Sequence, residues 1–282
     1  MNGKTVWIKI NMFAILLSIM SLSTKVVKAQ EVEESYCQNF PEHCDFLTQF
    51  YKAHYKKIEI HAAALKLSPS FFLAIVAPEV ANFNPIQNEL EYHSMSYFYV
   101  NWGEAQANFS IGYFQMKPIF VRQLESEIQK RSALKSNQAA FAYKRTDEVE
   151  IRRERLERLY ELDWQLNYLA IFCKIMAIKH QYTLFKSEAD KLAFYAAAYN
   201  RGYTHPEAEI RRWIGVKWFP NAGKGGDFAY ASVALELWGL IQSIRRCVVD
   251  MKGGCVVDMK GGCVVDMKGP SYLLHTAALN KV

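Results

Sequence analysis

Beyond its first 29 residues, the 282-residue chain contains no apolar run long enough to cross a bilayer. Its six cysteines and seven histidines show none of the spacings that hold metals, such as Cys-x-x-Cys or His-Glu-x-x-His. The glycine-rich segment 221–226 lacks the spacing and the trailing Ser or Thr of a phosphate-binding loop. The sequence therefore predicts no metal, no organic cofactor and no membrane span after residue 29.

Residues 1–29 have the features of a secretory signal peptide. Lys4 and Lys9 precede the apolar run Met12–Leu22, and Val27–Ala29 offers a cleavage site. Because the apolar run is short for a bilayer span, we expect cleavage near Ala29 and a periplasmic or secreted protein. The alternative is an uncleaved N-terminal anchor.

Most of the net positive charge belongs to this leader. The whole chain has 34 Lys+Arg and 28 Asp+Glu, a formal net charge of +6. Four of the basic residues and none of the acids lie in residues 1–29, so the rest carries 30 basic against 28 acidic residues, a net charge of +2. This small charge, with no basic stretch interleaved with aromatics, does not favour nucleic acid as a partner.

Residues 30–246 have the length and composition of one globular domain. The chain is 51% hydrophobic, with 17 Phe and 16 Tyr, which is ample for a core. Segments such as Asp45–Leu67 and Trp164–Met176 place apolar residues at helical spacing, so we expect a mainly helical domain. We expect Ile86–Asn108 to be irregular. The highly charged segment Glu148–Asp163 is interpreted as a solvated helix face or a protruding helical insert.

The C-terminal segment, residues 247–282, is repetitive. The octapeptide CVVDMKGG occupies Cys247–Gly254 and Cys255–Gly262, and CVVDMKGP follows at Cys263–Pro270. An eight-residue unit is too short to build a solenoid, and its paired glycines oppose helix formation. We interpret the segment as a slipped duplication that forms a flexible tail. The alternative is that its cysteines link chains by oxidation.

Two of the remaining cysteines are placed to pair with each other. Cys37 and Cys44 bracket a short loop that contains a proline, and export permits disulfides. Cys173 lies in an apolar helical run and is expected to be a buried small hydrophobe.

The first candidate for a catalytic element is a short apolar helix that carries one acidic residue. In the segment Leu67–Pro85, Ser68 is suited to cap the helix and Pro69 to occupy its first position. The helix is apolar on more than one face and should be buried, and Pro78 disturbs its last turn. Glu79 is thus placed in apolar surroundings, where a carboxyl has a raised pKa and can act as a general acid. The alternative is a Glu that has emerged into solvent.

The segment Ser110–Pro118 predicts a tight turn followed by a helix. Ser110 and Gly112 favour the turn, and Gly112 can adopt a positive φ or let a ligand approach the backbone. Gln115 carries a donor and an acceptor, which suit sugar hydroxyls or an acetamido group. The alternative is a glutamine that caps the turn.

A third segment ends a buried helix. The three alanines before Tyr199 allow a neighbouring helix to approach closely, and Asn200 with Gly202 forms the helix stop. Tyr199 thereby places a hydroxyl at the end of the helix. The alternative is a tyrosine that only fills the core.

Taken in order, these segments resemble the soluble-type lytic transglycosylases of the lysozyme-like superfamily. Glu79 with the downstream Asn82–Pro85 is similar to the family's Glu-Ser followed by Phe-Asn-Pro. Ser110–Pro118 is similar to its Gly-Leu-Met-Gln motif, and Ala198–Gly202 to its Ala-Tyr-Asn-Ala-Gly motif. The resemblance covers residues 60–215.

The resemblance implies a lysozyme-like domain, mainly α with minimal β, that cleaves peptidoglycan glycan strands without a cofactor. Glu79 would protonate the glycosidic oxygen between N-acetylmuramic acid and N-acetylglucosamine. Its carboxylate would then take the proton of the muramic C6 hydroxyl as that oxygen attacks C1, which leaves a 1,6-anhydro end. The residues that would line the groove and bind substrate are Ser110, Gly112, Gln115, Tyr199 and Asn200.

The chain also departs from the family pattern. Val80 stands where the family has Ser, Phe83 lies one residue further from Glu79, and Tyr113-Phe114 replaces Leu-Met. The family Ser helps to position the substrate or the acid, so Val80 bears on affinity or orientation. The acid itself is retained.

Two other functions stay open on the sequence. A lysozyme-type hydrolase needs a second carboxylate to direct water, which Glu89, Glu91 or Glu104 can supply. A non-catalytic peptidoglycan-binding or scaffold protein on the same fold is favoured by Val80 and disfavoured by the retained Glu79.

Overall fold

The computed structural model describes residues 35–219, 228–250, 255–257 and 263–265. The expected signal peptide, residues 1–29, lies outside these residues, and so does most of the expected tail. From Tyr36 onward the described elements belong to one unit of the chain.

Helices make up most of the described residues, which confirms the predicted mainly α class. Strands β1 (Lys217–Phe219) and β2 (Phe228–Ala229) pair antiparallel. The α-helices are α2 (Tyr36–Asn39), α3 (Pro41–Ala63), α4 (Pro69–Ala74), α5 (Ala77–Ala81), α6 (Pro85–Trp102), α7 (Pro118–Lys130), α8 (Gln138–Phe141), α9 (Glu148–Tyr160), α10 (Leu162–Lys179), α11 (Glu188–Arg201), α12 (Glu207–Trp213) and α13 (Tyr230–Asp250), and a 3-10 helix η1 spans Ser132–Asn137.

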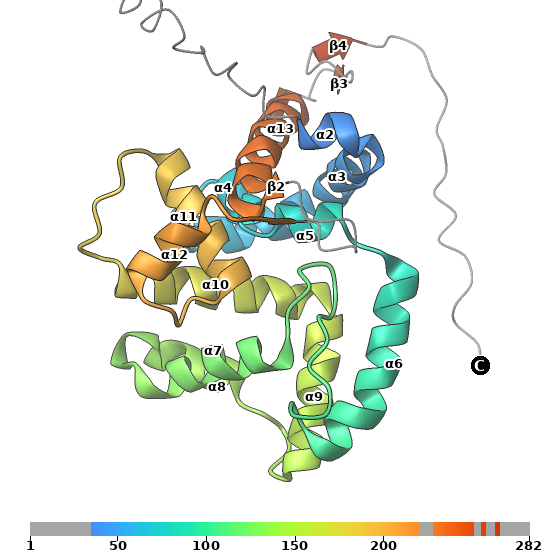
Figure 1. Cartoon of the computed structure of the whole chain (residues 1–282), viewed down its shortest axis with the longest axis vertical. Helices are drawn as coiled ribbons and strands as arrows, with labels where there is room; N and C mark the ends of the chain where they lie inside the picture. Colours follow the sequence, from blue (N-terminus) through green and yellow to red (C-terminus); the bar gives the residue numbers. More distant parts are fainter. Residues whose placement is uncertain (1–34, 220–227, 251–254, 258–262, 266–282) are drawn as a thin grey trace, which may run out of the picture. The chain divides into compact units, whose positions relative to one another are not determined.

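One part of the core forms where α13 packs against α3, α4, α5 and α11 (Figure 1). Helix α4 is buried along its whole length, because it is apolar on all sides, and Phe71 and Phe72 are among its fully buried rings. The Ser68 hydroxyl accepts a hydrogen bond from the Phe71 N–H at 3.1 Å, and the helix begins at Pro69. Both predicted start signals of this helix are therefore confirmed.

A second group of helices packs around a buried ion pair. Arg155 of α9 donates hydrogen bonds of 2.8 and 3.0 Å to Glu125 of α7, and one of 2.9 Å to the Tyr99 hydroxyl of α6. Arg158 of α9 is buried as well, at 3% exposure. The expectation of a solvated or protruding helix over Glu148–Asp163 is therefore only partly correct, because one face of α9 is exposed at Glu148 and Arg153 while the other face buries two arginines. Helix α9 packs along α6 (Figure 1), and its buried arginines are tolerated because each has acceptors from other elements.

The stretch expected to be irregular, Ile86–Asn108, is mostly helix α6, so that expectation is wrong. Asn84 caps this helix by accepting a hydrogen bond from the Gln87 N–H at 3.0 Å, and Pro85 occupies its first position. Apolar side chains occur on several faces of α6, which hides the helical period in the sequence. Those that are 45–74% exposed are Ile86, Leu90, Tyr97, Phe98 and Trp102.

The first described helix is fixed to α13. The carboxylate of Glu236 accepts hydrogen bonds from the backbone N–H groups of Tyr36 at 2.8 Å and Cys37 at 3.0 Å, at the start of α2. Cys37 and Cys44 form a disulfide, with their Cα atoms 5.7 Å apart, so the predicted pairing is confirmed. Cys173 is a buried free thiol, as expected.

The repeat region begins inside a helix. Helix α13 runs to Asp250, past the expected domain end at Arg246, and so includes the first four residues of the first octapeptide. The Cys-Val-Val segments of the second and third copies form β3 (Cys255–Val257) and β4 (Cys263–Val265), which pair antiparallel. The rest of the expected tail lies outside the described residues.

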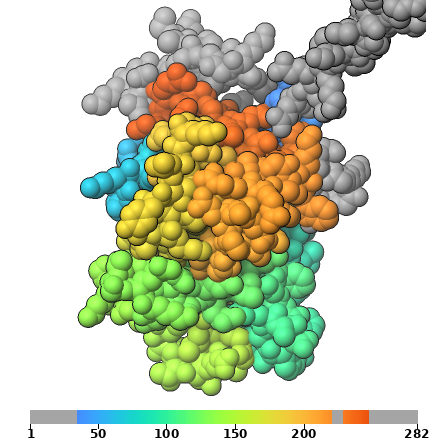
Figure 2. Space-filling model, turned by 60° about the vertical axis from the view of Figure 1, so that its left-hand side comes forward, coloured from blue at the N-terminus to red at the C-terminus, as the bar shows by residue number. Residues whose placement is uncertain are grey.

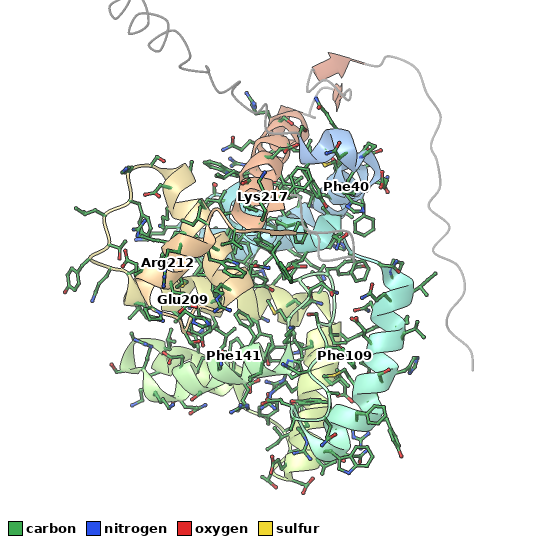
Figure 3. The ribbon with its side chains drawn as sticks, viewed as in Figure 1. Phe40, Phe109, Phe141, Glu209, Arg212 and Lys217 are labelled. Carbon is green, nitrogen blue, oxygen red and sulfur yellow. A yellow bond between two sulfur atoms is a disulfide. The ribbon has the colours of Figure 1, made fainter. Side chains whose placement is uncertain are left out.

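No helix in the described part of the chain combines the length and apolar character of a membrane span. Figure 2 shows the face on which the orange residues of α12 lie above the green residues of α7 and α8. Glu209 of α12, labelled in Figure 3, accepts hydrogen bonds of 3.0 and 2.6 Å from Arg201 of α11. This ion pair links α12 to the end of the helix that carries Tyr199.

Candidate active site

Glu79 lies just after a break between two short helices. The single helix expected from the sequence is divided into α4 and α5, with Ile75 and Val76 in the turn between them. Pro78 lies in the first turn of α5, where its missing N–H costs no hydrogen bond. Every residue from Ser70 to Ala81 is buried except Glu79, part of whose side chain is accessible to solvent. The local sequence thus places one carboxyl at the edge of an otherwise apolar segment.

The surroundings of Glu79 hold its carboxyl in the protonated form. Burial among apolar groups raises the pKa of Glu79 to about 8, and the positive charge of Lys117 opposes this shift. Among the described residues, neither a hydrogen bond nor a second acid contributes to it. Most of the side chain is buried, but part of it remains accessible from solvent, so the protonated carboxyl can donate its proton to a bound molecule.

Tyrosines from three elements interact with the charge of this carboxyl. Burial raises the pKa values of Tyr36, Tyr199 and Tyr230, and the negative charge of Glu79 raises them further, so each phenol lies within reach of that charge. The Tyr199 hydroxyl donates to the Phe114 carbonyl at 2.6 Å, and the Tyr230 hydroxyl donates to a backbone carbonyl at 3.3 Å. Since these two protons are used there, neither phenol donates to the Glu79 carboxylate, and the ionised form stays unfavourable.

The turn predicted after Ser110 is present and closes between Ile111 and Met116. These two residues exchange backbone hydrogen bonds of 3.0 and 3.1 Å. Gly112 has φ +78°, which confirms the predicted positive φ, and Gln115 has φ +47°. For Gln115 this left-handed conformation is strained by about 1–3 kcal/mol, so the surrounding structure must hold it in place.

A buried glutamine, and not a ligand, occupies the space beside Gly112. A Cβ added at Gly112 would lie 1.9 Å from Nε2 of Gln165 and 2.6 Å from the carbonyl oxygen of Leu159. Gln165 accepts a hydrogen bond from the Phe114 N–H at 2.7 Å and donates one to the Leu159 carbonyl at 2.9 Å. Asn88 of α6 accepts one from the Gly112 N–H at 2.7 Å. Glycine is required here because the Gln165 amide lies against the backbone.

Sequence reasoning missed both of these amides. Asn88 lies in the stretch expected to be irregular, and Gln165 is a polar residue in a segment that otherwise reads as core helix. A polar residue inside an apolar helical period is the one signal that marks Gln165 as a buried hydrogen-bonding group.

The structure brings the three sequence segments together. The ring of Phe83, just after α5, has its centroid 4.5 Å from that of Tyr113 in the turn. Tyr113 also contacts Phe50 of α3, at 5.0 Å between ring centroids. Tyr199 reaches the same turn through its hydrogen bond to Phe114. The Glu79 segment, the turn and the end of α11 therefore form one site.

The other candidate residues differ in how available they are. Gln115 is half-buried, and its Nε2 donates to the Gly112 carbonyl at 2.8 Å, which is the turn-capping contact considered from the sequence. Its Oε1 is the atom left to accept from a ligand. Asn200 is exposed and accepts a hydrogen bond from Trp213 Nε1 at 2.9 Å. Ser110 is half-buried directly before the turn.

The three acids considered as a second carboxylate are engaged elsewhere. Glu104 accepts hydrogen bonds of 2.8–3.0 Å from Arg122. Glu89 accepts one from the Tyr160 hydroxyl, and Glu91 accepts one from a neighbouring side chain of α6 at 2.8 Å. The structure therefore does not pair any of them with Glu79 through a shared contact.

Other features of the described residues do not compete with this site. No group of three or more His, Cys, Asp and Glu side chains in the described ranges is placed to hold a metal ion. A cavity of about 710 Å³ lies between α8 and α9, and Glu79 is not part of its lining. Two acids of that cavity are paired with arginines, Glu154 with Arg158 at 2.7 Å and Glu150 with Arg153 at 3.4 Å.

Comparisons with protein-family models, with curated proteins and with solved structures found no match for this chain. A function is therefore argued from the geometry and chemistry of the site. That site consists of a partly accessible acid with a raised pKa, a strained turn that carries Gln115, and the buried phenol of Tyr199.

Proposed function

We propose that the protein is a peptidoglycan lytic transglycosylase on a lysozyme-like helical domain, with Glu79 as its general acid and base. The observation that carries the proposal is Glu79 itself, a partly accessible carboxyl whose pKa is raised to about 8. The proposal is supported by the position of the Gly112–Gln115 turn and of Tyr199 at the same site, since these belong to the two other motifs of the family resemblance.

The reaction needs one carboxyl that first gives and then takes a proton. Protonated Glu79 donates to the glycosidic oxygen between N-acetylmuramic acid and N-acetylglucosamine as the bond from that oxygen to C1 breaks. The Glu79 carboxylate then accepts the proton of the muramic C6 hydroxyl while that oxygen bonds to C1. The 1,6-anhydro product forms without water, and the acid is regenerated. A single acid with a well-placed internal nucleophile is sufficient, whereas hydrolysis uses two carboxyl groups.

Other residues of the site would bind the glycan. The Oε1 of Gln115 can accept from an acetamido N–H or a hydroxyl. Ser110 and Asn200 would contact the glycan, and Tyr199 would act indirectly, by holding the Phe114 carbonyl of the turn. Gly112, expected from the sequence to bind substrate, is covered by Gln165 and is left out of this role. Val80, which stands where the family has Ser, is 0% exposed, so its side chain packs in the core and does not contact a bound glycan.

The expected location and partners complete the proposal. A signal peptide cleaved near Ala29 would deliver the protein to the periplasm or outside the cell. Its partner there would be the glycan strand of peptidoglycan. No nucleic acid and no cofactor is required by this chemistry.

Mass spectrometry of muropeptides released from purified peptidoglycan tests the proposal. We expect the full chain to release fragments lighter by one water than hydrolytic products, and Glu79→Gln to release them at least about 100-fold more slowly while still binding peptidoglycan. Reducing-end products would instead indicate a lysozyme-type hydrolase and direct attention to Glu89, Glu91 and Glu104. Binding without fragments from folded protein would indicate a scaffold protein.

A further inference from the structure

Two buried side-chain amides from α6 and α10 hold the turn at the site. We infer that Gln165 and Asn88 are positioning residues, which set the place of the Gly112–Gln115 turn relative to Glu79. The inference deepens the proposed function and rests on it for its kinetic readout.

Gln165 joins three segments with one amide. Its side chain is 0% exposed, accepts from the Phe114 N–H at 2.7 Å and donates to the Leu159 carbonyl at 2.9 Å. Leu159 lies in the last turn of α9, where helix carbonyls lack intrahelical partners. Gln165 itself lies in the first turns of α10. The end of α9, the start of α10 and the turn are therefore fixed to each other.

Asn88 holds the other side of the same turn. It is 6% exposed and accepts from the Gly112 N–H at 2.7 Å. With the Tyr199 hydroxyl on the Phe114 carbonyl, side chains from α6, α10 and α11 satisfy three backbone groups of the turn. A buried turn that cannot pair these groups internally depends on such partners to keep its position.

The position of this turn bears directly on Glu79. Tyr113 of the turn packs on Phe83 at 4.5 Å between ring centroids, just beyond the helix that carries Glu79. Lys117, directly after the bridge that closes the turn, is the cation that acts on Glu79. The strained φ of +47° at Gln115 is a state that such anchoring can maintain.

The pKa of Glu79 depends on the groups around its carboxyl, so a change in this pKa would report a displaced turn. The ionisable groups that interact electrostatically with Glu79 are Lys117 after the turn, Tyr36 of α2, Tyr199 of α11 and Tyr230 of α13. Helices α3 and α4, which also pack near α5, add none among the described residues. A displaced turn would move Lys117, whose charge lowers the pKa of Glu79, and would admit water to the carboxyl. The change in hydration outweighs the change at Lys117, because burial is the larger of the two influences on this pKa. Better hydration lowers the pKa of a buried acid.

The test uses Gln165→Met, which keeps a similar volume but has no amide, in the full chain. We expect kcat on peptidoglycan to fall by about 10- to 100-fold, because small misplacements at a reacting site have effects of that size. Because Glu79 acts in its protonated form, the rate falls as pH rises through its pKa, so the alkaline limb of the pH–rate profile should move to lower pH by at least about half a unit.

Matched variants separate positioning from a general loss of packing. Gln138→Met removes the amide of a half-buried glutamine away from the site, which donates to the Ile128 carbonyl at 3.1 Å and the Gln129 carbonyl at 3.4 Å, and should leave both kcat and the alkaline limb unchanged. Gln165→Glu, protonated when buried, offers one donor and one acceptor and should restore most of the rate at acidic pH. If Gln165→Met does not fold, Asn88→Leu, which removes a single hydrogen bond, takes its place with the same readouts.

A second readout does not depend on activity. Titration of the Glu79 carboxyl by carbon-13 NMR should give a lower pKa in Gln165→Met than in the parent and in Gln138→Met. An unchanged pKa and an unchanged alkaline limb in folded Gln165→Met would overturn the inference. If the parent chain cleaves no peptidoglycan, the proposed function fails, while this titration still decides whether the amides position the turn at Glu79.

Discussion

The hydroxyl of Tyr199 donates a 2.6 Å hydrogen bond to the carbonyl oxygen of Phe114, across 85 residues of sequence. The N–H of Phe114 is bound at the same time by Gln165 at 2.7 Å, so both backbone polar groups of this buried residue are satisfied by side chains. Leaving a buried polar group unpaired costs about 1–3 kcal/mol. Helices α10 and α11 therefore both hold Phe114, so a substitution at Gln165 or Tyr199 should disturb the turn.

Tyr199→Phe tests the contribution of this hydrogen bond. We expect the free energy of unfolding to fall by about 1–3 kcal/mol, because the Phe114 carbonyl is left unpaired, and kcat to fall by about tenfold as the turn loosens. Denaturant unfolding and product release measure the two effects. Tyr203→Phe is the control, since the buried Tyr203 hydroxyl has no hydrogen-bond partner in the described structure. Equal losses in both variants would contradict this account.

Glu79→Gln should lower the rate of glycan cleavage by about 100- to 10,000-fold, the usual contribution of a general acid. The amide is nearly isosteric, so the fold and peptidoglycan binding should be preserved. Glu104→Gln is the matched control. Because Glu104 is held by Arg122 and is not assigned to the reaction, its loss should leave cleavage close to that of the parent. A comparable drop in Glu104→Gln would favour a two-carboxylate mechanism.

The stability of the protein should also depend on the ionisation of Glu79. Its carboxyl has a pKa near 4.5 when unfolded and about 8 when folded, so the folded state binds the proton more tightly. This contribution to stability is complete below pH 4.5 and is lost as pH rises to about 8. Glu79→Gln removes it. We expect the parent to lose more thermal stability than the variant between pH 5 and 8.5, measured by Tm in parallel scans, and parallel curves would argue against a buried acid.

Gly112→Ala should disturb the site through Gln165. The new Cβ would lie 1.9 Å from Nε2 of Gln165, at a φ of +78° that side chains disfavour. We expect a loss of about 2–4 kcal/mol in unfolding free energy from these two effects, with a loss of activity. Gly239→Ala in α13 is the control, because a Cβ there meets nothing within 4 Å, and it should stabilise the helix by up to about 1 kcal/mol. Tolerance of Gly112→Ala would contradict the observed close approach.

Features that depend on neighbouring residues were predictable from the sequence. The Ser68 cap with Pro69, the positive φ of Gly112 and the Cys37–Cys44 disulfide all follow from local residue chemistry and are present. The apolar surroundings of Glu79 could be predicted for the same reason, since the residues on both sides of it are apolar.

Features that depend on distant partners were not predictable. In the sequence, the arginines of α9 belong to a charge pattern that is typical of an exposed helix. Arg155 is nevertheless buried, because Glu125 and Tyr99 supply acceptors from other helices. Asn88 and Gln165 gain their importance only when α6 and α10 meet the turn. The division between α4 and α5 was predictable only in part. Pro78 indicates a disturbed helix, but the break lies at Ile75 and Val76, which carry no turn signal of their own.

The anchoring of the turn also has a consequence for hydrogen exchange. The amide protons of Gly112 and Phe114 lie in a loop, where exchange with solvent is usually fast, but each is bound by a buried side chain of a different long helix. Exchange at these positions requires α6 or α10 to separate from the turn, and not a local fluctuation of the loop itself. The turn therefore belongs to the same cooperative unfolding unit as the helices that hold it.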